Sequence, residues 1–199
     1  MMRALLALIA MLACAGGNAA LAQEKTLSLS AMKVSLVEPS IYKTIWQDAF
    51  DKELALRKEL SAKTKRPVIA TVNVFQAIFE VPEGQVIVSS TGTPEVGCRT
   101  YQSIGLSSKL ITCPVRVALV RNKGPAGAVN EPKVVYSKPD YTFVLNPNSR
   151  GEFDNGGEKV RTLLTLNSTT KSLFTHLDDE TAPKGIAPSA NDSTIKLSY

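Results

Sequence analysis

The chain has few of the residues that most often hold metals or carry catalysis. It contains one histidine, three cysteines and one tryptophan in 199 residues. Zinc sites need several histidine or cysteine ligands at characteristic spacings, and the spacings here fit no such pattern. No phosphate-binding loop, dinucleotide fingerprint or kinase signature occurs either. We therefore predict no cofactor, no metal site and no catalytic residue that a motif could name.

Long hydrophobic runs are also missing, with one short exception at the start of the chain. Residues 1–22 carry a single positive charge, Arg3, then an apolar run from Ala4 to Ala13, and they end in small residues. This layout is typical of a secretory signal peptide with an A-x-A cleavage site before Gln23. The run is too short for a permanent membrane span. Lipidation at Cys14, after Met11-Leu12-Ala13, is the less favoured alternative.

Strong net charge is the third absence. Removal of residues 1–22 leaves 22 basic and 18 acidic residues, a net charge of +4 against +5 for the whole chain. No basic face interleaved with aromatic residues occurs, so we predict no nucleic-acid partner. The remaining 177 residues suffice for one domain with a core of its own. The short, alanine-rich signal favours a periplasmic or secreted location.

Two of the three cysteines flank a predicted β-hairpin. Folding the chain about Gly105 and Leu106 places Cys98 opposite Cys113 and Thr100 opposite Ile111. Odd-numbered residues from Ile111 to Leu119 are apolar, which puts Cys113 on the buried face. Opposed residues of an antiparallel pair can come within disulfide reach, and export supplies an oxidising compartment. We predict a structural disulfide; two buried free thiols are the alternative. Pro114 predicts an edge or a bulge.

A single amphipathic helix is expected over about residues 40–62. Pro39 and Ser40 suit its first turn and N-cap, and Pro67 excludes its continuation. Apolar residues recur at helical spacing, namely Ile41, Ile45, Trp46, Ala49, Phe50 and Leu54. Trp46 and Phe50 are expected to anchor the helix on a sheet. The less favoured alternative is that they contact a ligand or a partner. The basic end from Arg57 to Arg66 predicts a solvated helix terminus or a weak contact with anions.

The rest of the chain has the pattern of short strands. Residues 26–37 change their apolar face partway, which predicts a bulged strand or two short ones. Further strands are expected at 68–81, 85–90, 133–137, 141–145, 158–167 and 171–177, with a polar loop at 146–157. We predict a mainly β fold, an antiparallel β-sandwich or barrel-like domain over residues 23–180.

Two segments carry residues that could take part in chemistry, His176 with its neighbours and the acidic segment 151–158. His176 shares a strand face with Phe174 and precedes Asp178 and Asp179, but no serine stands in a nucleophile elbow. The segment 151–158 is rich in acids and glycine, yet its spacing differs from that of an EF-hand calcium loop. An ordinary histidine and an ordinary β-connection are the favoured interpretations.

The last segment, 181–199, is predicted to be a polar tail with a terminal strand. Ile195, Leu197 and Tyr199 alternate with polar residues. Such a strand can complete its own sheet or add to the edge of another chain's sheet. This ending resembles that of chaperone-assembled pilus subunits, although their cysteine arrangement and N-terminal donor strand are not evident here. Ile195, Leu197 and Tyr199 therefore join Trp46 and Phe50 as candidate contacts for a ligand or partner.

These observations favour an exported, non-catalytic binding or accessory protein. Inhibitors, immunity or antibiotic-protection factors and small-ligand binders all belong to this class, and the partner is an unidentified protein or small molecule. The alternative is an envelope or surface-assembly subunit that donates its C-terminal strand. A hydrolase that uses His176 is the third hypothesis.

Overall fold

The structure is a computed structural model that describes residues 24–91, 99–102, 109–122, 131–141, 152–155, 158–178 and 193–199. The predicted signal peptide, Cys14 and Cys98 lie outside these residues. Within them the chain forms eleven strands and two helices, in the order β1 (Glu24–Ser28), β2 (Ser30–Ser35), α1 (Ile41–Ile45), α2 (Gln47–Thr64), β3 (Thr71–Val81), β4 (Gly84–Thr91), β5 (Arg99–Gln102), β6 (Lys109–Arg121), β7 (Lys133–Tyr141), β8 (Glu152–Asn155), β9 (Glu158–Asn167), β10 (Ser172–Leu177) and β11 (Ser193–Lys196).

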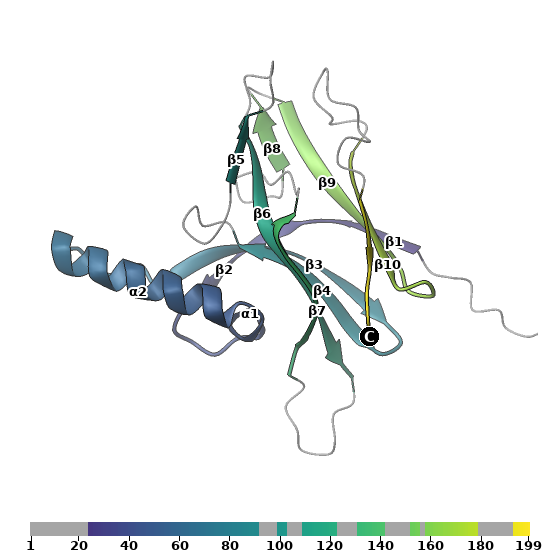
Figure 1. Ribbon diagram of the computed structural model, residues 1–199, viewed down its shortest axis with the longest axis horizontal. Coiled ribbons are helices and arrows are strands. Elements are labelled where there is room, and N and C mark those ends of the chain that lie inside the picture. Colours follow the sequence, from purple (N-terminus) through teal and green to yellow (C-terminus); the bar gives the residue numbers. More distant parts are fainter. Residues whose placement is uncertain are drawn as a thin grey trace, which may run out of the picture.

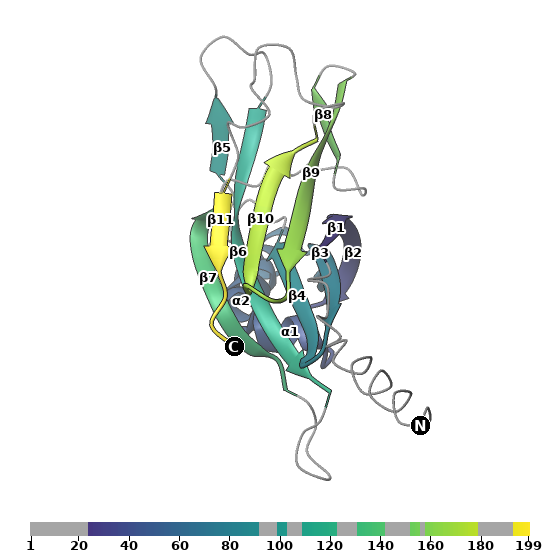
Figure 2. The same ribbon diagram turned by 90° about the vertical axis from the view of Figure 1, so that its right-hand side faces the viewer.

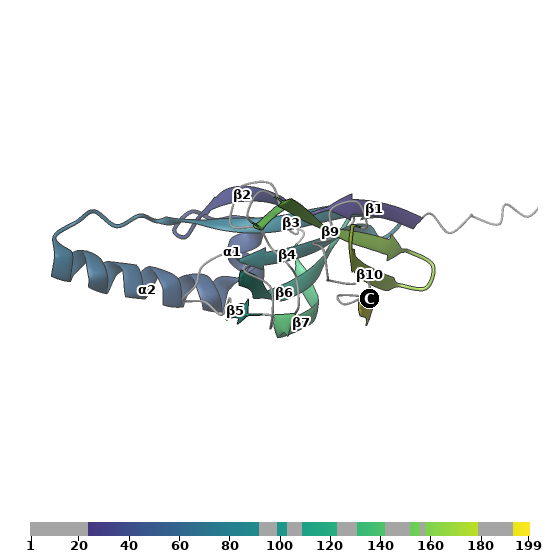
Figure 3. The same cartoon turned by 90° about the horizontal axis from the view of Figure 1, so that it is seen from above.

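The strands form two antiparallel sheets, and the described strands close no barrel. One sheet has the order β1-β9-β10-β11, with β8 also paired to β9; the other has the order β2-β3-β4-β6-β5, with β7 also paired to β6. The helices lie against the second sheet, and α2 projects well beyond it (Figures 1 and 3). Seen from the side, β9, β10 and β11 stand in front of β6 and β7 (Figure 2). The predicted mainly β class with antiparallel sheets is confirmed.

Two cores hold the three layers together. The core between the sheets contains, among others, Phe79, Val88, Val117, Leu164 and Leu173. The core between the helices and the larger sheet contains, among others, Leu36, Ile45, Trp46, Phe50 and Ile87. Strands β3, β4 and β6 contribute to both cores, because successive side chains of a strand point to opposite faces. This explains why the sequence of β3 is apolar on both faces.

The first two strands of the chain belong to different sheets. β1 pairs with β9, whereas β2 pairs with β3 of the other sheet. Leu27, Leu29 and Ala31 accordingly pack in the core between the sheets, and Met32, Val34 and Leu36 pack beneath the helices. The change of apolar face within 26–37 therefore marks two short strands, one of the two predicted alternatives.

Three predicted boundaries are wrong. β7 is one strand over Lys133–Tyr141, where the sequence predicted a break at residues 138–140. A bulge accommodates Pro139, so that pairing with β6 continues past it. Residues 152–155 of the predicted loop form β8, which pairs with β9. The helix is interrupted at Trp46, so α1 and α2 replace the single helix.

The turn between β3 and β4 depends on Gly84. This residue has φ +147°, and a Cβ atom there would lie 1.9 Å from the carbonyl oxygen of Val120. L-residues with a side chain rarely adopt this conformation. Glycine thus allows β6 to approach the start of β4, with which it pairs over Gly84–Ser90.

Candidate functional site

The break between α1 and α2 lies at Trp46, which also lines a groove described below. Ser40 caps α1, its hydroxyl accepting a hydrogen bond of 3.0 Å from the Lys43 amide, as the sequence predicted. The helix is interrupted at Trp46 and resumes at Gln47. The Trp46 amide donates to the Tyr42 carbonyl at 2.9 Å, and the Phe50 amide donates to the Trp46 carbonyl at 2.8 Å. The break therefore leaves the backbone around Trp46 hydrogen-bonded on both sides.

Arg116 of β6 fastens this joint to the sheet. Its Nη1 donates to the carbonyl of Ile45 at 2.7 Å, and its two terminal nitrogens contact Asp48 Oδ1 and Oδ2 at 2.6 and 2.8 Å. The guanidinium carbon also lies 4.6 Å from the centroid of a Trp46 ring, a cation–π contact. The hydrogen bond from Arg116 is the main cause that lowers the pKa of Asp48 below its usual value. One arginine thus links the end of α1, the start of α2 and the sheet.

Trp46 and Phe50, two predicted contact residues, are both fully buried beneath the helices. Trp46 Nε1 donates a hydrogen bond of 3.0 Å to Ser89 Oγ on β4. A buried indole is usually satisfied in this way. Both side chains anchor the helices on the sheet, and Trp46 additionally lines the groove described below.

The floor of the groove is a β-bulge between β6 and β7. Cys113 pairs with Tyr141 and Val115 pairs with Lys138, so Pro139 and Asp140 together oppose Pro114. Neither proline has an amide hydrogen to donate to a ladder. The two prolines therefore meet where regular pairing is interrupted, and the bulge is one of the two alternatives predicted from Pro114.

Between this bulge and α2 lies a groove of about 430 Å³. Small-molecule sites commonly have volumes of roughly 300 to 1,000 Å³. Its walls combine apolar side chains with a few charged ones; they are Trp46, Asp48, Ala49, Lys52, Glu53, Leu56, Pro114, Arg116, Ser137 and Pro139. We refer to this set as the α2 groove. It can accept a small ligand with an apolar body and one or two polar groups.

One charged side chain of the α2 groove is buried. The side chain of Glu53 is 0% exposed, and its Oε1 lies 2.6 Å from Nε of Arg57. Nη1 of Arg57 donates to the carbonyls of Ile69 and Thr71 at 2.6 and 2.8 Å. This arrangement holds the chain that follows α2 against the helix. Glu53 Oε2 has no hydrogen-bond partner among the residues that the structure describes.

The cysteine hairpin is described in part. β5 pairs with β6, and Thr100 lies opposite Ile111, the predicted register. The next pair in this register is Arg99 with Thr112. Cys98 is outside the described residues, so the disulfide with Cys113 stays a prediction.

The predicted C-terminal contact residues lie on or beside β11. This strand pairs with β10 of the same chain, with Ile195 opposite Leu173. Ile195 and Leu197 are buried between the sheets, and Tyr199 packs against the same core. Lys171 Nζ lies 4.5 Å from the Tyr199 ring centroid and donates to the Tyr199 backbone oxygen. Burial, followed by the charge of Glu83, raises the pKa of Tyr199.

His176 lies on β10, and the acidic segment contributes β8 and the start of β9. The His176 ring stacks on Phe174 with centroids 5.3 Å apart, as their shared face predicted, and Leu163 is its cross-strand partner. In the acidic segment, β8 pairs antiparallel with β9, and Asn155 lies opposite Glu158. The described residues contain no group of three or more His, Cys, Asp or Glu side chains that could hold a metal.

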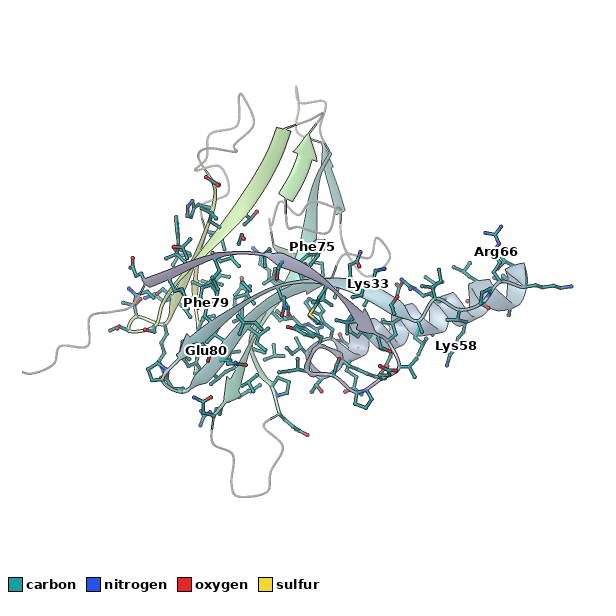
Figure 4. The ribbon with its side chains drawn as sticks, turned by 180° about the vertical axis from the view of Figure 1, so that it is seen from behind. Lys33, Lys58, Arg66, Phe75, Phe79 and Glu80 are labelled. Atoms are coloured by element: carbon teal, nitrogen blue, oxygen red, sulfur yellow. The ribbon has the colours of Figure 1, made fainter. Side chains whose placement is uncertain are left out.

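The basic end of α2 is divided between paired and solvated charges. Lys63 pairs with Glu59 at 2.6 Å, four residues away, as Arg57 pairs with Glu53. Lys58 on α2 and Arg66, two residues beyond its last residue, are exposed and extend into solvent (Figure 4). Among the described residues, neither helix is long and apolar enough to cross a membrane.

Comparison with known proteins gives no relative from which a role could be transferred. No family model, no curated protein and no solved structure matches the chain. The α2 groove therefore has to be interpreted from its own chemistry.

Sequence reasoning missed the charged residues of the groove. An arginine within the apolar run of β6 is one signal, because such a residue needs a partner when it faces a helix. The i, i+4 spacing of Glu53 and Arg57 is another. Neither signal reveals that β6 and α2 lie side by side in the fold.

Proposed function

We propose that this chain is an exported, non-catalytic binding protein whose ligand site is the α2 groove. The groove carries the proposal: it is large enough for a small molecule, and its apolar walls include a few placed polar groups. Its two carboxylates, Glu53 and Asp48, are already paired with Arg57 and Arg116, so this part of the site is formed before a ligand arrives. Such preorganisation lowers the entropy lost on binding.

Export and the disulfide belong to the same proposal. The layout of residues 1–22 supports cleavage before Gln23. The register of β5 and β6 supports a bond between Cys98 and Cys113, since positions 98 and 113 would form the next pair after Arg99 and Thr112. Mass spectrometry of the exported protein is expected to find the mature N-terminus and no thiol at these two positions that can be alkylated. Alkylation of both cysteines before reduction would contradict the disulfide.

Ligand retention tests the groove directly. We expect native mass spectrometry of the wild-type chain, after incubation with a small-molecule extract of the producing cells, to show an added mass. Leu56→Arg places a long charged side chain at the groove and should abolish the added mass. Val68→Arg is the matched control, because Val68 is 37% exposed against 36% for Leu56 and does not line the groove.

Two results would contradict the proposal. One is a wild-type chain that retains no small molecule, and the other is a Leu56→Arg variant that retains as much as wild type. The competing hydrolase hypothesis predicts turnover of ester, peptide or glycan substrates that is lost in His176→Ala.

A further inference from the structure

The end of α2 and the chain that follows it form an arm that projects beyond the sheets (Figures 1 and 3). We refer to residues 58–69 as the α2 arm. Every residue of the α2 arm is exposed except Ser61, which is half-buried. None of them lines the α2 groove, so the arm is a separate surface of the molecule.

Hydrogen bonds tie the two halves of the α2 arm together. The Ser61 hydroxyl donates to the carbonyl of Arg66, and Nη1 of Arg57 donates to the carbonyl of Ile69 at 2.6 Å. Lys65 ends the helix with φ +53°, in the left-handed region where glycine is usual. The arm thus carries a charged side chain at its turn, where a residue without a side chain is favoured.

Positive charge is concentrated in the α2 arm. The arm contains Lys58, Lys63, Lys65 and Arg66 against one acid, Glu59, which gives a net charge of +3. All the other residues of the chain together, 19 basic and 17 acidic, contribute only +2. Lys58 and Arg66 point to opposite sides of the arm (Figure 4). The cations therefore flank the arm on both sides.

Exposed apolar side chains lie among these cations. Leu60 is 47% exposed, Val68 is 37% exposed and Ile69 is 69% exposed. A single apolar side chain on a protein surface is ordinary, whereas several exposed together mark a site of interaction. The arm therefore combines the two features of a contact surface for an amphipathic, negatively charged partner.

The composition of the α2 arm favours a bilayer as this partner. The arm contains no aromatic residue. Energetically dominant sites of protein–protein contact are enriched in tryptophan and tyrosine, and single-stranded nucleic acids stack on aromatic side chains. A bilayer requires neither. Aliphatic side chains insert at the boundary between headgroups and acyl chains, and the long side chains of lysine and arginine reach the phosphates.

We propose that the α2 arm docks the protein on the surface of an anionic phospholipid bilayer. The four cations of the arm contact the lipid phosphates, and its three exposed aliphatic side chains insert beneath the headgroups. The two sheets and the α2 groove stay outside the bilayer. This inference goes beyond the proposed function, because it assigns a partner to a different surface.

Sedimentation with lipid vesicles tests the proposal. We expect the exported protein to bind vesicles of phosphatidylcholine and phosphatidylglycerol in equal parts, and to bind pure phosphatidylcholine vesicles far more weakly. Each cation near an anionic bilayer contributes about fivefold in affinity, so Lys58→Gln/Arg66→Gln should weaken binding about 25-fold. Added salt should also weaken binding of the wild-type protein, because salt screens exposed charges.

The control for total charge is Lys25→Gln/Lys196→Gln. Both lysines are exposed, and they lie on β1 and β11 of the smaller sheet. This variant loses the same two charges outside the arm and should bind like wild type. Differences between variants cannot come from residues 1–22, because all variants share them.

A second pair of variants tests insertion of the apolar side chains. Leu60→Gln/Ile69→Gln should weaken binding at least about tenfold, since each buried aliphatic side chain stabilises the bound state. This loss should persist at high salt. Val37→Gln/Val134→Gln is the matched control, because Val37 and Val134 are 56% and 39% exposed outside the arm. It should bind like wild type.

Each contrary result overturns the proposal. Absence of binding to the phosphatidylglycerol vesicles, or equal binding to neutral vesicles, removes the anionic bilayer as the partner. An equal loss in Lys25→Gln/Lys196→Gln means that total charge, and not the arm, attracts the protein. Unchanged binding of Leu60→Gln/Ile69→Gln means that nothing inserts; an equally tight complex with polyglutamate would then identify an acidic protein as the better partner. If a variant fails to fold, the lipid and salt dependence of the wild-type protein decides alone.

Discussion

Two ion pairs on α2 have the same spacing and the same length but differ in burial. Arg57 with Glu53 and Lys63 with Glu59 are both i, i+4 pairs with a nitrogen–oxygen distance of 2.6 Å. The Glu53 side chain is 0% exposed and that of Arg57 is 22% exposed, whereas Lys63 and Glu59 are 67% and 61% exposed. Replacing each cation by methionine removes the charge and retains an unbranched apolar side chain.

Arg57→Met should lower the free energy of unfolding by about 3 kcal/mol, since loss of one partner of a buried pair leaves an uncompensated charge. Its hydrogen bonds to the carbonyls of Ile69 and Thr71 contribute less, because these lie at exposed positions that water can solvate. Lys63→Met should cost about 0.5 kcal/mol or less, as exposed helix pairs do. For a domain of this size, 3 kcal/mol corresponds to a fall in Tm of about 6–12 °C.

Urea unfolding followed by circular dichroism and Trp46 fluorescence measures both values. The double variant Glu53→Leu/Arg57→Met should recover most of the loss, because it removes the buried charge together with its partner. Equal destabilisation by Arg57→Met and Lys63→Met would refute the reasoning. So would a double variant whose loss equals the summed losses of Glu53→Leu and Arg57→Met measured singly, since the two groups would then not be coupled.

Three further predictions concern other parts of the fold. Ile195→Ala should destabilise the domain by about 2–5 kcal/mol in the same assay, because Ile195 is buried between the sheets; a change below 1 kcal/mol would favour a strand that is donated to another chain. Gly84→Ala should cost more than about 1 kcal/mol, because the new Cβ would collide with the Val120 carbonyl; unchanged stability would contradict the turn geometry. Because the folded-state pKa of Asp48 is depressed, its pair with Arg116 stabilises the fold above the usual carboxyl pKa and loses this contribution as the pH falls through the folded value. Asp48→Asn should therefore lower stability at neutral pH by about 1 kcal/mol or less, given the exposure of Asp48, and leave it unchanged at low pH.

The sequence predicts local structure well where a single residue type determines it. Ser40 marks the start of α1, Pro114 marks the bulge in the sheet, and the alternation of apolar residues gives the register of Thr100 with Ile111. Each of these depends on backbone chemistry or on a period of two within one segment. The interruption at Trp46 could not be found in this way, because its stripe of apolar residues continues from α1 into α2.

The continuity of β7 was missed for a related reason. Lys138-Pro139-Asp140 has the composition of a turn, and proline cannot donate to the ladder. In the structure β7 lies beside β6, and the bulge opposite Pro114 takes up the extra residue. The two prolines occupy the same irregularity, so neither interrupts a second pair of hydrogen bonds. Local sequence cannot show this, because the compensation comes from another strand.

The α2 groove depends on contacts of this long-range kind. Its floor is the bulge of β6 and β7, and its wall is a helix held by Arg116, whose partners Ile45 and Asp48 are 71 and 68 positions away in the chain. Arg116 lies two residues after Pro114, so the residue that docks the helix is on the same strand face as the proline at the floor. Arg116 lines the groove and also bonds to the carbonyl of Ile45 and to Asp48 at the joint of the helices. Substitutions at Arg116 should therefore change ligand affinity and helix docking together.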